Sequence, residues 1–486
     1  MKINLGDVVG RTSAASAVTP APAEAATASR SAIAAMKRRL GKAVILPDES
    51  GFDAARSAYN LAVQHNPLAV VVPETPEAAA EAVAIAADGL LPIGVQSTGH
   101  GIGAAAAGGI LINTSKLAGV SVNPVGRTAR VGGGATWGAV IAASSEHGLA
   151  ALNGTSDTVG ALGFISGGGL PVHGRSYGFA ADHVRSLRLV APDGQILTLS
   201  PERHPELFWA VRGGKSNYGL LLEATIDLFP LRHLTGGQLV FPGVLGERVL
   251  RAWHEWIQDV PDEMTSAISF LHFPDAPFIP EPLRGQHLVS IRIAYTGTPE
   301  HGEELLRPLR ALGPVQDDVR PRPYADIARI ANDPTTPTPS IDQTGLFDRL
   351  NAGDLDTLLS VVGPDHPTAP ASVEVRHLGG KLAAQPKHRN AIGPARHAGF
   401  TFWMVDLVPG SEHLPRIEAA HLAIMKTMEP LLTGGRFPNF VSLADLTPEA
   451  VRSCYAPADY RRLVELKTKV DPHNLFRVNH NIGPAR

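Results

Sequence analysis

The first half of the chain alternates short apolar runs with glycine-rich turns, a pattern that predicts many short strands. β-Branched residues fill 68–72, and the apolar runs at 90–95 and 109–113 have the length of buried strands. The turn Pro192-Asp193-Gly194 joins two further runs as a hairpin. The remaining strands are expected at 120–122, 128–131, 184–190, 195–199 and 220–228.

Helices are expected between these strands, where apolar residues recur at helical spacing. Thr75 and Pro76 begin one that runs to about residue 87, because proline suits the first helical position. The alanine-rich stretch 137–147 predicts another helix, ending at Gly148. Shorter helices are expected at 52–63 and 205–211.

The pattern changes after Pro230, where glycine becomes rarer and the elements lengthen. Residues 313–345 are rich in proline and are expected to be irregular, and the polar stretch 436–486 is expected to consist mainly of loops. Alternation of long helices and strands predicts an α+β fold with an antiparallel sheet covered by helices. The helices are expected at 246–259, 300–311 and 411–428, and the strands at 265–273, 287–296, 371–378 and 400–407.

Composition narrows the classes of protein. A length of 486 residues is too great for one hydrophobic core, so we expect two or more domains. The 43 basic and 46 acidic residues nearly balance, which argues against a nucleic-acid partner or a polybasic membrane surface. Cys454 is the single cysteine, and the 19 histidines lack metal-binding spacing, so neither a disulfide nor a metal site is predicted.

Residues 12–35 are rich in alanine, serine, threonine and proline, without the basic start and continuous apolar core of a secretory signal. We expect a flexible leader there, with a first helix before residue 44. No apolar run approaches the ~20 residues of a membrane-spanning helix. A cytoplasmic protein without a membrane partner is expected.

Two runs of small residues, 94–103 and 154–178, each follow an apolar strand and carry the candidate chemistry. Glycine lets a ligand approach the main chain closely, and successive free N–H groups can hold a phosphate. His100 lies within the first run, where a bound cofactor would pass. A glycine-rich turn with an incidental histidine is the alternative interpretation of that stretch alone.

Each run also matches a motif of another enzyme class. Residues 101–106 fit the Gly-x-Gly-x-x-Ala pattern of dinucleotide-binding folds, but no Asp or Glu lies between Asp88 and Glu146 to bind a ribose. Residues 174–178 fit Gly-x-Ser-x-Gly, but a glycine run precedes them and a strand follows, the reverse of a nucleophile elbow. Neither a Rossmann dehydrogenase nor a serine hydrolase is favoured.

Further motifs follow in order: the run from Tyr177 to Asp182, the stretch 471–476 and the triplet Asn479-His480-Asn481. Taken with the two small-residue runs, they make the chain from about residue 45 onward resemble the flavoproteins of the p-cresol methylhydroxylase/vanillyl-alcohol oxidase superfamily. Within that superfamily it resembles the berberine bridge enzyme-like oxidoreductases. The chain is therefore expected to divide into a leader and first helix at 1–44, an FAD-binding domain at 45–230, a substrate domain at 231–435 and a segment returning to the FAD domain at 436–486.

The resemblance also implies an FAD site. The loop 96–101 would wrap the pyrophosphate, and His100 would bond covalently to the flavin 8-methyl group. Relatives with a second covalent bond carry cysteine where this chain has Ser156, so a single histidyl bond is expected. The arginine that begins this loop in most relatives is Gln96 here. The implied FAD-binding residues are Gln96, Ser97, Thr98, Gly99, His100, Gly101, Ser156, Val159, Gly160, Gly163, Gly167, Gly168, Tyr177, Gly178, Asp182, Val184, Asn479 and Asn481.

Two residues match positions of the family's catalytic base, Tyr455 and Glu374. On a strand, Glu374 and Arg376 share one face. In an apolar pocket the pKa of Glu374 would be raised, which suits a base. A purely structural ion pair between Glu374 and Arg376 is the alternative.

The implied function is oxidation of a small hydroxyl- or amine-bearing molecule, such as a secondary metabolite or sugar-like compound. A base would take the substrate proton while hydride passes to flavin N5, with dioxygen as the expected acceptor. Ile165 falls near the position that limits oxygen access in the family, which keeps open a dehydrogenase with another acceptor. A non-redox flavin-binding or cyclisation protein is the remaining alternative.

Overall fold

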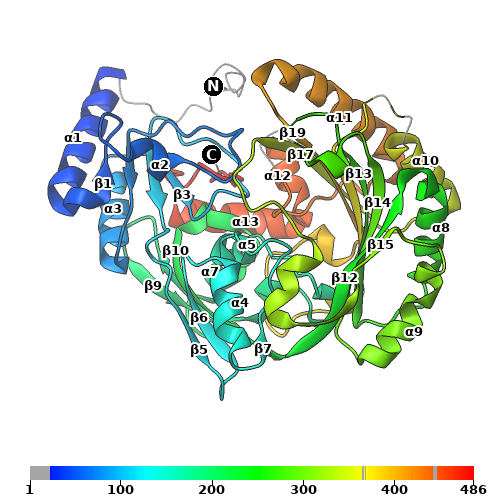
Figure 1. Cartoon of the computed structure of the whole chain (residues 1–486). Helices are drawn as coiled ribbons and strands as arrows, with labels where there is room; N and C mark the ends of the chain where they lie inside the picture. Colours follow the sequence, from blue (N-terminus) through cyan, green and yellow to red (C-terminus); the bar gives the residue numbers. More distant parts are fainter. Residues whose placement is uncertain (1–21, 278, 364–365, 367, 442–445, 486) are drawn as a thin grey trace.

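The computed structural model describes residues 22–277, 279–363, 366, 368–441 and 446–485. Its N-terminal half holds two small sheets and a two-stranded pair, β7 Leu149–Ala150 with β11 Phe229–Pro230 (Figure 1). One has the order β1-β2-β4-β3, with β2, β4 and β3 parallel. The other, β5-β6-β10-β8-β9, is antiparallel. The strands are β1 Val44–Ile45, β2 Ala69–Val71, β3 Ile93–Gln96, β4 Ile110–Asn113, β5 Val120–Asn123, β6 Thr128–Gly132, β8 Val184–Val190, β9 Ile196–Leu199 and β10 Leu220–Asp227.

Helices in this half begin where local signals predict them. The Thr75 hydroxyl accepts a hydrogen bond from the Ala78 N–H (3.1 Å), and Pro76 opens the helix that follows. The leader prediction is wrong for residues 22–35, which lie in a helix that packs on α3; residues 12–21 lie outside the described residues. The helices are α1 Pro22–Leu40, α2 Phe52–Arg56, α3 Pro76–Asp88, α4 Trp137–Ser145, α5 Ala161–Ser166, α6 Gly174–Tyr177 and α7 Pro205–Ala210.

Helix α2 is shorter than predicted because the chain after Arg56 bonds to other segments. The Tyr59 N–H donates to the Thr98 carbonyl (2.9 Å), and the Asn60 N–H donates to the Gly99 carbonyl (3.2 Å). Tertiary hydrogen bonds therefore replace the helical ones that the sequence pattern predicts.

The C-terminal half is organised around one large antiparallel sheet of order β15-β12-β14-β13-β18-β19-β17, with β16 paired to β12. Helices α8, α9, α10 and α11 cover its outer face (Figure 1). The predicted α+β fold is therefore confirmed. The strands are β12 His233–Pro242, β13 Met264–His272, β14 His287–Tyr295, β15 Gln316–Asp317, β16 Arg320–Pro323, β17 Ser340–Phe347, β18 Ser372–His377 and β19 Phe400–Leu407, and the helices are α8 Gly246–Trp256, α9 Pro299–Arg310, α10 Ala352–Val362 and α11 Leu414–Met428.

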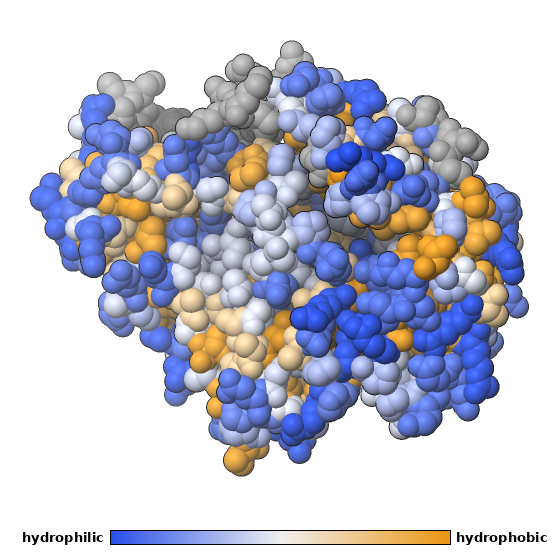
Figure 2. All heavy atoms as spheres, in the orientation of Figure 1, coloured by the Kyte–Doolittle hydropathy of each residue, from blue (hydrophilic) through white to orange (hydrophobic). Residues whose placement is uncertain are grey.

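Apolar and polar side chains alternate along these strands, so one face of the sheet is apolar and the other is polar. Ile268 and Val375 pair across β13 and β18 and pack under the helices. On the opposite face Ser269 lies beside Glu374, in the same register. The exposed sides of α8 and α9 are largely hydrophilic in Figure 2. The polar face of the sheet therefore points away from the helices.

Two predictions of irregular structure are wrong. Residues 340–347, within the proline-rich stretch, form edge strand β17, because β19 supplies a full ladder of partners. The C-terminal stretch contains α12 Pro448–Ser453 and α13 Pro457–Val470, so it is not mainly loop.

The end of the chain lies against the first sheet (Figure 1, red). Val478 forms a parallel bridge with Gly94, and the Ile93 N–H donates to the Leu475 carbonyl (2.8 Å). This brings residues 475–482 beside the strand that leads to His100. Within the described part of the chain, no helix has the length and apolarity to cross a bilayer.

Candidate functional site

The two small-residue runs meet at His100. Its Nε2 is hydrogen-bonded to Thr158 Oγ1 (2.8 Å), and that hydroxyl is also bonded to Ser156 Oγ (2.9 Å). The Gly160 N–H donates to Thr98 Oγ1 (3.2 Å). Segments far apart in the sequence thus form one surface, with the imidazole at their junction.

His100 is held as a neutral ring. Tyr59 stacks on it with the ring centroids 3.6 Å apart and the planes 15° from parallel. Burial lowers the pKa of His100 to about 4, so the imidazole is unprotonated at neutral pH. A neutral imidazole has a lone pair available for bonding, which protonation would remove.

The first loop presents unused donors. The backbone N–H groups of residues 97–103 donate to no acceptor among the residues that the structure describes. Ser97 Oγ is also buried without a described partner. Buried polar groups of this kind are normally satisfied, so the loop fits a ligand rich in acceptors, as the pyrophosphate of FAD is.

The predicted glycines fall into two groups. A Cβ at Gly101 or Gly163 would meet nothing within 4 Å, so the protein itself gives no steric reason for glycine there. A Cβ at Gly160 would lie 2.7 Å from Ser97 Oγ, which explains how the two runs approach so closely. A Cβ at Gly99 would lie 2.6 Å from Ala58 Cβ. The predicted close approach of a ligand therefore has no competing explanation at Gly101 and Gly163 only.

Gly167 and Gly168 have protein neighbours instead. A Cβ at Gly167 would lie 2.8 Å from atoms of Asn439 and Lys215, and one at Gly168 would lie 2.9 Å from Phe437. Both glycines therefore serve packing against the C-terminal segment. Gly178 has φ +97 and follows α6, where only glycine is unstrained.

Gln96 supports the loop from behind. It is 5% exposed; its Oε1 is bonded to His65 Nε2 (2.9 Å) and its Nε2 donates to the Ser57 carbonyl (2.8 Å). His65 Nδ1 in turn accepts from the Ala106 N–H (2.8 Å). Sequence reasoning missed His65, Tyr59 and Thr158, because each acts through a contact with a distant segment.

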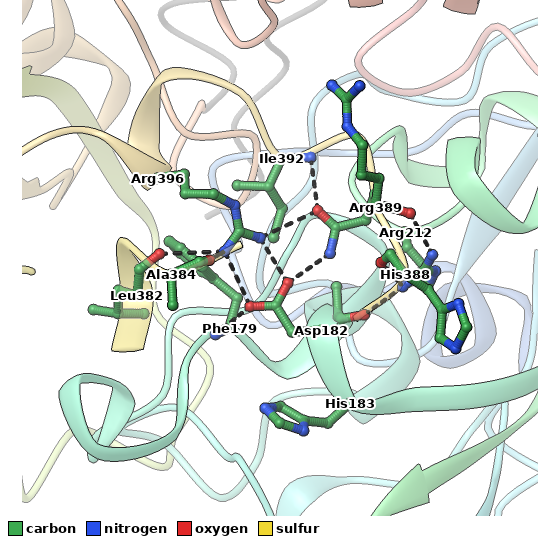
Figure 3. Close-up of polar contacts among 12 residues, drawn as sticks. Phe179, Asp182, His183, Arg212, Leu382, Ala384, His388, Arg389, Ile392 and Arg396 are labelled. Atoms are coloured by element: carbon green, nitrogen blue, oxygen red, sulfur yellow. Dashed lines mark hydrogen bonds and ion pairs between the residues drawn. The ribbon is translucent and has the colours of Figure 1, made fainter. Parts of the chain in front are cut away.

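Asp182 is committed to protein contacts (Figure 3). Arg396 Nη2 and Asn390 Nδ2 donate to its Oδ1, each at 2.6 Å, and the Phe179 N–H donates to Oδ2 (3.1 Å). Arg212 donates to the main chain of the same loop at the Arg389 carbonyl (2.6 Å). Asp182 therefore fixes the loop 379–398 of the second half to the first half.

The other predicted residues differ in position. Val184 is 4% exposed and its side chain belongs to the core, while Val159 is half-buried beside Thr158. Tyr177 packs against Phe229. The Oδ1 atoms of Asn479 and Asn481 are buried and have no hydrogen-bond partner in the described part of the chain.

Glu374 lies between two arginines on the polar face of the large sheet. Arg292 Nη1 donates to its Oε2 (2.6 Å), and Arg376 Nη2 donates to its Oε1 (2.7 Å). Burial disfavours the charged form, but Arg376 and Arg292 outweigh it and hold the pKa of Glu374 below its ordinary value. The expectation that an apolar pocket would raise the pKa of Glu374 is wrong. Arg292, on strand β14, adds a second positive charge that the local sequence around Glu374 does not reveal.

A cavity joins this cluster to the second run. Thr155 and Val172 line it from the first half, and Arg292 and Arg376 line it from the second. Thr155 precedes Ser156, whose hydroxyl is bonded to the partner of His100. The cavity therefore lies between the arginine partners of Glu374 and the second small-residue run.

Tyr455 is 4% exposed, and its hydroxyl donates to the Gly213 carbonyl (3.1 Å). Burial raises its pKa well above the ordinary value, so this tyrosine is protonated at neutral pH. Tyr455 does not line the cavity.

Comparisons with known proteins agree with this geometry. Residues 67–200 match the family model described as FAD binding domain, and residues 437–483 match the one described as Berberine and berberine like. The chain is 28% identical over 459 residues to (R)-6-hydroxynicotine oxidase of Paenarthrobacter nicotinovorans, covering 91% of this chain and 96% of that protein.

Solved structures show the same fold. The crystal structure of 6-hydroxy-D-nicotine oxidase from Arthrobacter nicotinovorans matches with a TM-score of 0.75 at 25% identity, over 91% of this chain and 98% of the other. Chitooligosaccharide oxidase matches with a TM-score of 0.80 at 20% identity, over 94% of this chain and 100% of the other. The two domain matches, this relative and the shared fold together support a berberine bridge enzyme-like FAD-linked oxidoreductase of the p-cresol methylhydroxylase family.

Proposed function

We propose that this enzyme oxidises a hydroxyl- or amine-bearing small molecule, with FAD held by a single covalent bond to His100. The observation that carries the proposal is the neutral imidazole oriented by Thr158 beside unused N–H donors. Ser156 supports a single bond, because its hydroxyl lacks the nucleophilicity of a thiolate. The similarity to 6-hydroxynicotine oxidase supports an amine- or hydroxyl-bearing substrate.

Bound FAD would supply the acceptor for substrate hydride. The chain's own contribution is to position the substrate beside the polar face of the large sheet and to take its proton. Glu374 is the better candidate for the base, because it is ionised at neutral pH and its two arginine partners line the cavity, although Glu374 itself does not. Tyr455 is buried, protonated and bonded to Gly213, so it serves to order the 213–215 turn.

Dioxygen is the proposed acceptor of the electrons. Ile165 is 1% exposed and packs in the core, so it gives no reason to favour a dehydrogenase. Next to Thr158, which contacts His100, the half-buried branched side chain is that of Val159 and not that of Ile165. Anaerobic reduction by substrate followed by timed mixing with oxygen separates the two: slow reoxidation would mean a different acceptor, and absence of reduction would mean a non-redox protein.

The covalent bond is tested by acid precipitation of the purified protein. Yellow colour should stay in the pellet of the parent protein and move to the supernatant in His100→Ala. His147→Ala, which changes an exposed histidine, should behave as the parent. Colour retained in the His100→Ala pellet would assign the attachment to another residue.

A further inference from the structure

Lys215 adopts a backbone conformation that is unfavourable for lysine. Its φ of +57° lies in the left-handed region, which favours glycine. It follows Gly213 and Gly214 in a turn whose Gly213 carbonyl accepts the Tyr455 hydroxyl. Strain of this kind persists where the surrounding structure requires that side chain, and it concentrates at functional sites.

The ammonium of Lys215 lacks a counter-charge. The residue is only 9% exposed, yet no described residue accepts a hydrogen bond from its Nζ or forms an ion pair with it. Lys467, another buried lysine, donates to Asp471 Oδ2 (2.6 Å) and to the Asn217 carbonyl (2.7 Å). An isolated buried cation is costly, so the Lys215 site calls for an anionic partner that the described residues do not supply.

This ammonium belongs to the region between the two small-residue runs. A Cβ on Gly167, in the second run, would lie 2.8 Å from Lys215 Cε. Burial, together with the charge of Lys215, lowers the pKa of His480 to about 3. The His480 ring in turn lies 2.9 Å from where a Cβ on Gly103 would stand, at the end of the first loop.

Its protonation state suits a cation. Burial lowers the pKa of Lys215 to about 8, opposed in part by the nearby Cys454, so most molecules carry the charge at neutral pH. Asn479 Nδ2 donates to Ser216 Oγ (3.2 Å), next to Lys215 in the chain, so the C-terminal segment packs on the same turn. A ligand that fills this place therefore meets one strong donor.

We infer that Lys215 is the cation that binds an anionic group of FAD between the two small-residue runs. The inference goes beyond the covalent bond to His100 and rests on FAD binding alone. Two groups of FAD have the required chemistry: the pyrophosphate, and the pyrimidine edge of the ring, which carries negative charge in the reduced state. Either one would supply the partner that the ammonium lacks.

The test is Lys215→Met, which removes the charge and keeps the length. If the partner is the ring, the affinity of the bound flavin for sulfite should fall at least tenfold. The two-electron midpoint potential should also fall, by about 30 mV for each tenfold loss of binding to the reduced ring relative to the oxidised ring. If the partner is the pyrophosphate, the Kd for added FAD should rise at least tenfold in a His100→Ala background. The inference would be overturned if sulfite affinity and the Kd for FAD both changed less than twofold and the midpoint potential shifted by less than about 10 mV.

Matched variants separate charge from packing. Lys215→Arg keeps the charge, so its sulfite affinity, midpoint potential and Kd for FAD should lie close to those of the parent. Lys215→Gly relieves the positive φ but removes the charge, so it should resemble Lys215→Met. Parental values in the glycine variant and not in the arginine variant would mean that strain, and not charge, is responsible. Lys467→Met should lower the melting temperature and leave sulfite affinity and potential unchanged. If Lys215→Met does not fold, the comparison of Lys215→Gly with Lys215→Arg gives the same information. The acid-precipitation assay of His100 is independent, so either idea can fail alone.

Discussion

At the scale of single residues, the chemistry depends on buried groups whose charge is set by their neighbours. Glu374 is ionised because two arginines surround it. His100 is neutral because burial disfavours the protonated ring and no neighbouring carboxylate among the described residues offsets that cost. The same type of residue would behave differently on an exposed strand or loop. The environment therefore assigns the protonation state on which each proposed role depends.

Glu374→Gln should lower kcat by about 10²–10⁴-fold, the range typical of a lost general base, with flavin content unchanged. The pKa of Glu374 is held below its ordinary value by Arg376 and Arg292, so the carboxylate should stay ionised at a pH where an ordinary glutamate is already protonated, and activity should lose this base only in stronger acid. Steady-state rates against pH for the parent and the variant check this. Full activity in Glu374→Gln would return the role of base to another residue.

Fully buried histidines should make the protein less stable in mild acid. Burial lowers the pKa of His173 to about 4, so between about pH 6.5 and about pH 4 the unfolded chain takes up a proton that the folded chain does not. The free energy of unfolding should fall with decreasing pH by about 1.4 kcal/mol per pH unit for this residue. Urea denaturation across that range should show a shallower dependence in His173→Phe, and the parental dependence in His147→Ala.

At the scale of elements, local signals predict where helices begin, and pairing decides what lies between them. Thr75 and Pro76 mark the start of α3 in the sequence, and the structure has the cap that they predict. The edge strand β17 was not predictable from its proline-rich surroundings, because its partner β19 lies more than fifty residues away. The site followed the same division: His100 and the glycines are visible in the sequence, whereas Tyr59, His65 and Arg292 are recognised only after the chain folds.

The contact between the two small-residue runs can be tested with one methyl group. Gly160→Ala should separate the runs and reduce flavin content, because the new Cβ would lie 2.7 Å from Ser97 Oγ. Ser97→Gly in the same chain removes the obstructing atoms and should restore part of the flavin content. Gly119→Ala, where a Cβ meets nothing within 4 Å, is the control. Normal flavin content in Gly160→Ala would show that the close approach is unimportant.

At the scale of the whole molecule, the two halves are joined by polar contacts as well as by a shared core. Asp182 of the first half and Arg396 of the second form a buried pair, with side chains 6% and 4% exposed. The core cluster that contains Ile226 of β10 also contains Leu346 of β17. The halves should therefore unfold together.

Asp182→Ala should lower the free energy of unfolding by about 3–5 kcal/mol, because it leaves Arg396 buried without its carboxylate. Adding Arg396→Met should recover part of that loss, since no unpaired charge then remains. Asp193→Ala, at an exposed turn, should change stability by no more than about 0.5 kcal/mol. Denaturant titrations followed by two probes check both the loss and the common transition, and an unchanged midpoint in Asp182→Ala would contradict this account.

Residues 59 and 60 have a consequence for motion. On one side their N–H groups hold the loop of His100, and on the other the Asn60 side chain accepts from the Ser340 N–H (3.1 Å) while the Thr338 N–H donates to the Tyr59 carbonyl (3.0 Å). Strand β17 begins at Ser340 and is an edge strand of the large sheet, so one short tether spans from the His100 loop to that edge. Any shift of β17 is transmitted through residues 59 and 60 to the His100 loop, and the two are expected to move as one piece.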